Sequence, residues 1–160
     1  MSASIRAITV GMLALFVAFM LEHLPVPQLI SWFQPAWVLV VITLLVFQSP
    51  QTFGLWLAVP AGLMLDAEQG TLLGTHVFTL AVHIFLVQMF FRRMEVFNLF
   101  QQMGMVLMLA LLQQLLRFWL AQVVLELPHP IDLWGPAWSS AFVWPWVFSL
   151  TQITIRRLSL

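Results

Sequence analysis

The chain of 160 residues contains no cysteine, no lysine and no tyrosine. Without cysteine it can form neither a disulfide nor a thiolate nucleophile, and it has no cysteine ligand for a metal. Charged residues make up only 8% of the sequence, against about 25% in a soluble domain. Hydrophobic residues make up 62%, and the mean hydropathy is +0.99. Water therefore cannot be the main solvent, and the composition indicates an integral membrane protein.

The formal net charge is zero, which gives no basis for nucleic-acid binding. The N-terminal segment MSASIRAITVGMLALFVAFMLEHL carries one arginine, Arg6, and then a long apolar run. A cleaved signal peptide would show a shorter apolar core and an A-x-A-like cleavage site. We therefore expect this segment to be retained as the first membrane span.

Six apolar stretches are candidates for spanning helices, which need about 20 residues with a range of about 17 to 25. They lie near residues 7–24, 35–48, 53–69, 72–91, 103–125 and 134–155. The second and third are short, and Pro60 lies inside the third, so we expect tilt, a kink or a half-embedded turn there. The loops are too short for a separate soluble domain. The sequence thus predicts an all-α integral membrane protein, with residues 1–160 forming one bundle of six transmembrane helices.

The arginines predict the orientation of this bundle, because cytoplasmic flanks of membrane spans carry an excess of basic residues. With six spans, one side holds both termini and five arginines, namely Arg6, Arg92, Arg93, Arg156 and Arg157. The opposite side holds most of the acidic residues, namely Glu22, Asp66, Glu68, Glu126 and Asp132. We therefore expect both termini to be cytoplasmic.

The stretch GLMLDAEQGTLLG, residues 62–74, repeats a small or acidic residue at every fourth position: Gly62, Asp66, Gly70 and Gly74. Small residues at this spacing let helix backbones approach closely in lipid. In a structural interpretation, the glycines permit a close turn between the third and fourth spans, and Asp66 accepts backbone N–H groups at the start of the next helix. In a functional interpretation, Asp66 contacts a partner or ligand, since ionisable groups at membrane depth are costly and usually functional.

Arg117 lies near the middle of the fifth span, one turn after Gln113. An arginine at that depth costs several kcal/mol unless it pairs, snorkels to the interface or meets water. We expect it to face the bundle or a protein partner, with Gln113 or Gln114 beside it. A snorkelling arginine relieved by local water is the alternative, and Asp66 is a candidate counter-ion.

Two other groups of polar residues give no sign of catalysis or metal binding. His76 and His83 are seven residues apart and share a helix face, but two histidines without a third ligand do not make a metal site. We expect them to be packed and hydrogen-bonded. Ser139 and Ser140 do not lie in a G-x-S-x-G motif, and no base is placed beside them. We predict no catalytic residue, no cofactor and no metal.

Two aromatic segments have a structural and a binding interpretation. In FVWPWVF, Trp144 and Trp146 flank Pro145, which suits packing around a proline kink or, alternatively, a wall that stacks on a ligand. In residues 92–102, Arg92 and Arg93 are followed by apolar residues at helical spacing, Met94, Phe97 and Phe100. This pattern predicts a short helix in the headgroup region or, alternatively, a docking face for a cytoplasmic partner.

Three segments together resemble the rod-shape-determining protein MreD family: FQPAWVLVVITLL, the stretch GLMLDAEQGTLLG, and WPWVF in the last span. The resemblance covers essentially the whole chain, and the spacing of Gly62, Asp66, Gly70 and Gly74 is its most specific element. It implies an inner-membrane component of the bacterial elongation machinery. Such a component binds the bitopic protein MreC and links it to MreB, to the RodA glycosyltransferase and to its partner penicillin-binding transpeptidase. It also implies a fold like the substrate-binding membrane subunit of energy-coupling-factor (ECF) transporters.

The resemblance leads to a hypothesis in which the chain is a non-catalytic scaffold in the lipid bilayer. The close turn leaves a groove on the outer face, edged by Asp66, and the single helix of a partner packs along the small-residue face. The alternative is a small-molecule-binding subunit of an ECF-type transporter. Its inner cavity would need polar side chains from several spans, for which the candidates are His76, His83, Gln113 and Arg117.

Overall fold

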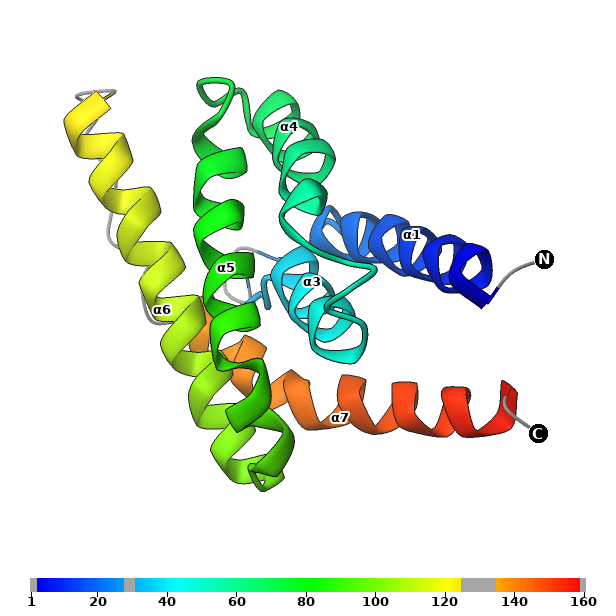
Figure 1. Cartoon of the computed structure of the whole chain (residues 1–160). Coiled ribbons are helices and arrows are strands. Elements are labelled where there is room, and N and C mark those ends of the chain that lie inside the picture. Colours follow the sequence, from blue (N-terminus) through cyan, green and yellow to red (C-terminus); the bar gives the residue numbers. More distant parts are fainter. Residues whose placement is uncertain (1–2, 28–30, 125–134, 159–160) are drawn as a thin grey trace.

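The computed structural model describes residues 3–27, 31–124 and 135–158 (Figure 1). Within these ranges the chain forms α-helices and one short 3₁₀ helix, with no strand. The elements are α1 (Ala3–Glu22), α3 (Trp37–Gln48), η1 (Leu55–Leu57), α4 (Ala58–Gln69), α5 (Thr75–Val96), α6 (Leu99–Val124) and α7 (Gly135–Leu158). The predicted all-α fold is confirmed, and each of the six predicted apolar stretches corresponds to one α-helix. Glu126 and Asp132, used above for orientation, lie outside the described residues.

Three of the described helices are long and apolar enough to cross a membrane by themselves. Their apolar stretches are Ile5–Glu22, Thr75–Arg93 and Leu99–Val123. Helices α3 and α4 have 12 residues each, which at 1.5 Å per residue is about 18 Å and shorter than a hydrocarbon core of about 30 Å. This agrees with the short second and third stretches of the sequence. The chain has the architecture of a helical membrane protein.

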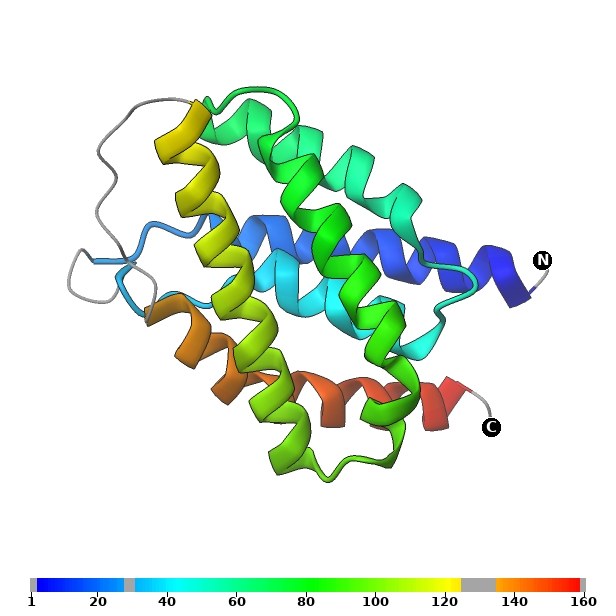
Figure 2. The same ribbon diagram turned by 60° about the vertical axis from the view of Figure 1, so that its left-hand side comes forward.

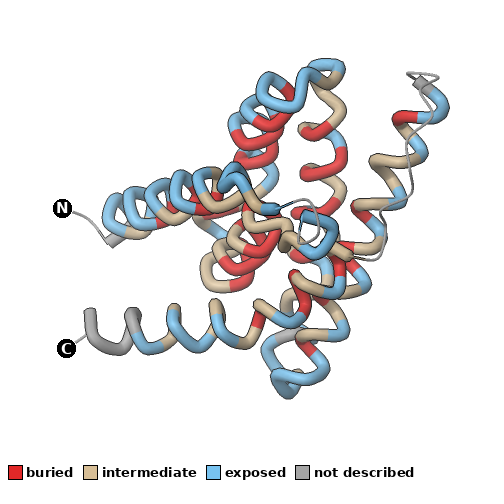
Figure 3. The backbone as a smooth tube through the Cα atoms, turned by 180° about the vertical axis from the view of Figure 1, so that it is seen from behind, coloured by how far each residue is buried: buried red, intermediate tan, exposed pale blue. Residues whose placement is uncertain are grey.

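Helix α3 lies at the centre of the bundle. It packs against α1, α5 and α7, and Val40, Ile42 and Val46 are fully buried (Figure 3). A helix that is apolar on all sides belongs in such a central position. Helix α1, by contrast, is exposed along most of its length, and α4 packs chiefly on α5. Both termini lie toward the same end of the bundle in Figures 1 and 2.

The start of α4 explains how Pro60 is accommodated. The 3₁₀ helix η1 leads directly into α4, so that Pro60 is the third residue of that helix. In a first turn the missing N–H of proline would have had no intrahelical partner anyway. Pro60 therefore stands near the beginning of the helix, and it does not interrupt its middle.

The small residues of α4 are used within the chain. A Cβ atom on Gly62 would lie 2.5 Å from the backbone Cα of Val77 in α5, which no side chain can tolerate. Ala58 and Ala61 are also buried in the core. The hypothesis that a partner's helix packs along this small-residue face is therefore wrong at Gly62, because α5 already occupies it.

The connection between α5 and α6 also differs from the expectation. No separate short helix forms at residues 92–102, because α5 continues to Val96 and α6 begins at Leu99. The backbone N–H of Asn98 donates to Oε1 of Gln101 over 3.1 Å, and the N–H of Gln102 donates to the Asn98 carbonyl over 2.9 Å. The first bond is the half of a capping box that the N3 side chain supplies, and the second is the first backbone bond of α6, so a new helix starts at this point.

Candidate functional site: the Asp66 cluster and the α1–α4 groove

The turn from α4 into α5 depends on two glycines in the left-handed region of backbone conformation. Gly70, which follows α4, has φ 62° and ψ 25°, and Gly74, which precedes α5, has φ 106°. Only glycine adopts such angles without steric cost. The N–H groups of Gly70 and Thr71 both donate to the backbone carbonyl of Asp66 and close the end of α4.

The carboxylate of Asp66 is the centre of a group that we call the Asp66 cluster: the buried residues Asp66 and His76 with the half-buried residues Thr71 and Gly74. Its Oδ2 accepts the Gly74 N–H over 2.7 Å. Its Oδ1 accepts the His76 N–H over 3.0 Å, His76 Nδ1 over 2.7 Å and the Thr71 hydroxyl over 2.8 Å. Asp66 is 1% exposed. The carboxylate thus caps the N-terminus of α5 from α4, which is the geometry of the structural interpretation, and it is not accessible to a partner.

The two histidines of α5 are packed and hydrogen-bonded, as predicted, and each is 2% exposed. Nδ1 of His76 faces Oδ1 of Asp66, and an ionised carboxylate can only accept, so this contact requires the ring proton on Nδ1. His83 contacts the Thr43 hydroxyl through Nε2 over 2.8 Å, and Thr43 donates to the Leu39 carbonyl over 2.7 Å. Among the described residues no group of three metal-ligating side chains exists.

Arg117 ties α6 to the end of α4. Its Nη2 donates to Oε1 of Gln69 over 3.0 Å, a contact across 48 residues of sequence. The charges of Glu22 and Asp66 act on the guanidinium, although neither carboxylate is its direct hydrogen-bond partner. Arg117 therefore lies near the Asp66 cluster, but its neutral partner Gln69 was not a candidate at the sequence level.

The start of α3 is capped by residues that sequence reasoning missed. Its N-cap residue, Ala36, has no side chain able to accept a hydrogen bond. The N–H of Val38 instead donates to Oε2 of Glu22 over 2.9 Å, and the N–H of Ala36 donates to the Ser140 hydroxyl over 3.0 Å. An alanine before an apolar run signals that some other element must supply the cap. Ser140 therefore has a structural use in the bundle.

Trp144 takes part in packing. It is fully buried, its Nε1 donates to Oε1 of Gln102 over 3.2 Å, and its ring stacks on Phe148 with the centroids 6.0 Å apart. The indole ring of Trp144 is covered by protein and cannot stack on a ligand. Of the two tryptophans, only Trp146 is exposed, at 75%, and could contact a ligand.

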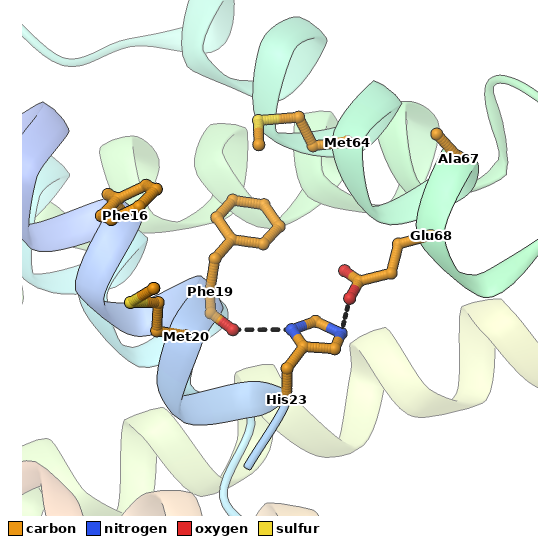
Figure 4. A pocket seen from close by; sticks show the side chains of 7 residues that line it. All are labelled: Phe16, Phe19, Met20, His23, Met64, Ala67 and Glu68. Atoms are coloured by element: carbon orange, nitrogen blue, oxygen red, sulfur yellow. Dashed lines mark hydrogen bonds and ion pairs between the residues drawn. The ribbon is translucent and has the colours of Figure 1, made fainter.

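A groove runs between α1 and α4, with a volume of about 500 Å³ (Figure 4). We call it the α1–α4 groove, and its lining residues are Phe16, Phe19, Met20, His23, Met64, Ala67 and Glu68. One end is polar: Nε2 of His23 pairs with Oε1 of Glu68, while Nδ1 of His23 lies 2.6 Å from the Phe19 carbonyl. The rest is apolar, and Phe16, Met20 and Met64 are more than half exposed. The face of α4 opposite its small residues is thus available for contact.

Comparison with known proteins assigns the chain to a family. The sequence model of the rod shape-determining protein MreD matches residues 2–154. The chain belongs to the MreD family. The rod shape-determining protein MreD of Haemophilus influenzae (strain ATCC 51907 / DSM 11121 / KW20 / Rd) is 28% identical over 147 residues, which cover 90% of this chain and 89% of that protein. No solved structure matches, so the likeness to the ECF transporter subunit stays a prediction.

Replacing Asp66 by alanine is predicted to destabilise the folded protein by about 3 to 5 kcal/mol, because the backbone N–H groups of Gly74 and His76 and the buried His76 ring lose their acceptor. Asp66→Asn keeps one acceptor oxygen and is expected to cost less. The measurement is thermal unfolding of the purified protein in detergent. Glu68→Gln is the matched control, since that exposed carboxylate belongs to a surface pair worth about 0 to 1 kcal/mol. Equal melting temperatures for Asp66→Ala and Glu68→Gln would contradict the capping role.

Proposed function

We propose that this chain is a non-catalytic scaffold of the bacterial cell-elongation (rod) complex in the inner membrane. In this role it binds MreC directly and helps to control cell shape and peptidoglycan synthesis, with MreB, RodA and a penicillin-binding transpeptidase in the same complex. Family membership over nearly the whole chain is the observation that carries the proposal. The buried histidines and Ser140 support a structural use of these residues, since each makes hydrogen bonds inside the bundle.

The α1–α4 groove is the surface that we assign to the transmembrane helix of MreC. The small residues of α4 face α5, so an incoming helix meets the outer side of α4, where Met64 is 54% exposed. On α1, Phe16 and Met20 are 56% and 62% exposed beside the same groove. In lipid, helix association is driven by van der Waals packing and by polar contacts. The groove can make both kinds of contact: its apolar side chains pack, and the His23–Glu68 pair at one end supplies polar groups.

The alternative function, a subunit that binds a small molecule for an ECF-type transporter, has less support. A second cavity is lined by Gln113, Gln114 and Arg117, and its volume is about 20 Å³. Pockets for ligands of vitamin size are about 300 to 1,000 Å³ and draw polar groups from several elements. Here all three polar side chains belong to α6.

We also propose that the six helices cross the membrane six times, with both termini in the cytoplasm. In Figure 2 the termini and the α3–α4 connection lie toward one side of the bundle, and the α4–α5 turn lies toward the other. A reporter enzyme that is active only outside the cytoplasm should be inactive when fused at either terminus and active when inserted at Leu73, which is 72% exposed in the α4–α5 turn. Activity at one terminus alone would overturn the six-crossing arrangement.

The scaffold proposal predicts that MreC co-purifies with the tagged protein from native membranes in a fixed ratio. A triple variant, Phe16→Ala, Met20→Ala and Met64→Ala, should reduce the recovered MreC about fivefold or more, which corresponds to about 1 kcal/mol of lost packing. The protein level should stay unchanged, because these side chains are exposed.

The control is the double variant Phe85→Ala and Met89→Ala, whose side chains on α5 are exposed to a similar degree, 54% and 56%. It should retain MreC at the native ratio. Equal losses in both variants would overturn the groove assignment. Recovery of an ATPase pair without MreC would overturn the scaffold function in favour of transport.

A further inference from the structure

A small internal cavity lies where α6 meets the starts of α3 and α7. Its apolar walls include Leu39, Ala110 and Ala137, which are 5%, 3% and 0% exposed. Its polar lining consists of three residues of α6: Gln113, Gln114 and Arg117. Neither the Asp66 cluster nor the α1–α4 groove includes this cavity.

The polar lining holds hydrogen-bonding groups that the protein leaves without partners. Gln113 is 6% exposed, and its Oε1 has no hydrogen-bond partner among the described residues. A buried acceptor without a donor is destabilising. Arg117 has five N–H donors, and the described hydrogen bond to Gln69 uses one of its terminal nitrogens. The cavity thus combines an unmatched acceptor with a guanidinium that has further donors.

Size and hydrogen bonding together select the ligand. The cavity leaves about 20 Å³ in which the centre of a water molecule can move, and one water needs about 10 to 15 Å³. Nothing larger fits without displacing the walls. A single water, which both accepts and donates hydrogen bonds, matches the size of the cavity and both of its polar groups.

We propose that this cavity is a binding site for one ordered water, which accepts a hydrogen bond from the Arg117 guanidinium and donates one to the side-chain amide oxygen of Gln113. The site hydrates the arginine from inside the bundle, while the hydrogen bond of the guanidinium to Gln69 lies on the exposed side. The cavity lies beside the starts of α3 and α7, where Ala36 and Ser140 make their hydrogen bond.

A thermodynamic cycle on the full-length protein tests this site. Ala137→Val fills the cavity, and Gln113→Met removes the amide at similar volume. In the native background, Ala137→Val should lower the melting temperature by about 2 to 6 °C, because it displaces the water and leaves the amide unmatched. In the Gln113→Met background, the same substitution should lower it by less than half as much.

Ala121→Val is the control for crowding, since Ala121 is buried on α6 but does not line the cavity. Its effect should be the same in both backgrounds. If Ala137→Val also has equal effects in the two backgrounds, only overpacking is measured and the water site is refuted.

A second measurement does not depend on the stability of any variant. X-ray radiolysis of the intact protein generates hydroxyl radicals at bound waters, and these radicals modify the side chains that they touch. Leu39 lines the cavity, whereas Leu44, on the same helix and equally exposed at 5%, does not. The water site predicts that Leu39 is modified at least several times faster than Leu44. Equal protection of the two leucines would overturn it.

Discussion

A carboxylate buried in an apolar bundle persists only if its oxygens are matched by donors, and this constraint shapes the α4–α5 hairpin. Asp66 receives two of its donors from the backbone at the start of α5, and these are in place only if the chain turns back sharply. Gly70 and Gly74 supply the left-handed backbone for that turn. Gly62 lets α4 approach Val77 closely enough for the carboxylate to reach. The four-residue spacing in the sequence is thus the signature of a single interaction.

Once α4 is fixed against α5, the two faces of α4 have different uses. The small residues and Asp66 face α5, and Met64 and Glu68 line the α1–α4 groove. Two further polar contacts between helices lie at the same end of the bundle: Glu22 caps α3, and Arg117 donates to Gln69. A hairpin held from inside in this way offers a partner a rigid, mostly apolar surface, which is what a scaffold in lipid requires.

The amino-acid sequence predicts much of this arrangement, and the failures have identifiable causes. Apolar runs locate the six α-helices of the described residues, since contact with lipid demands apolar side chains. The spacing of Gly62 and Asp66 indicates a close contact between helices, but it does not identify the second helix. The sequence-based hypothesis places a partner's helix on the small-residue face, whereas the structure places α5 there. The contacts between Ser140 and Ala36 and between Arg117 and Gln69 join residues 104 and 48 positions apart, and no local pattern encodes such pairs. The break after Val96 has a local signal, the asparagine at the N-cap of α6 followed three residues later by a glutamine that bonds to it.

We propose that the interior cap at Asp66 leaves the α1–α4 groove as the surface for MreC. The chain lacks cysteine, so a single cysteine can be placed at will and cross-linked in native membranes to a cysteine in the transmembrane helix of MreC. An MreC interface in the groove predicts efficient cross-linking from M64C, in the groove, and little from M89C, at a similarly exposed position on α5. Cross-linking from M89C with none from M64C would contradict it.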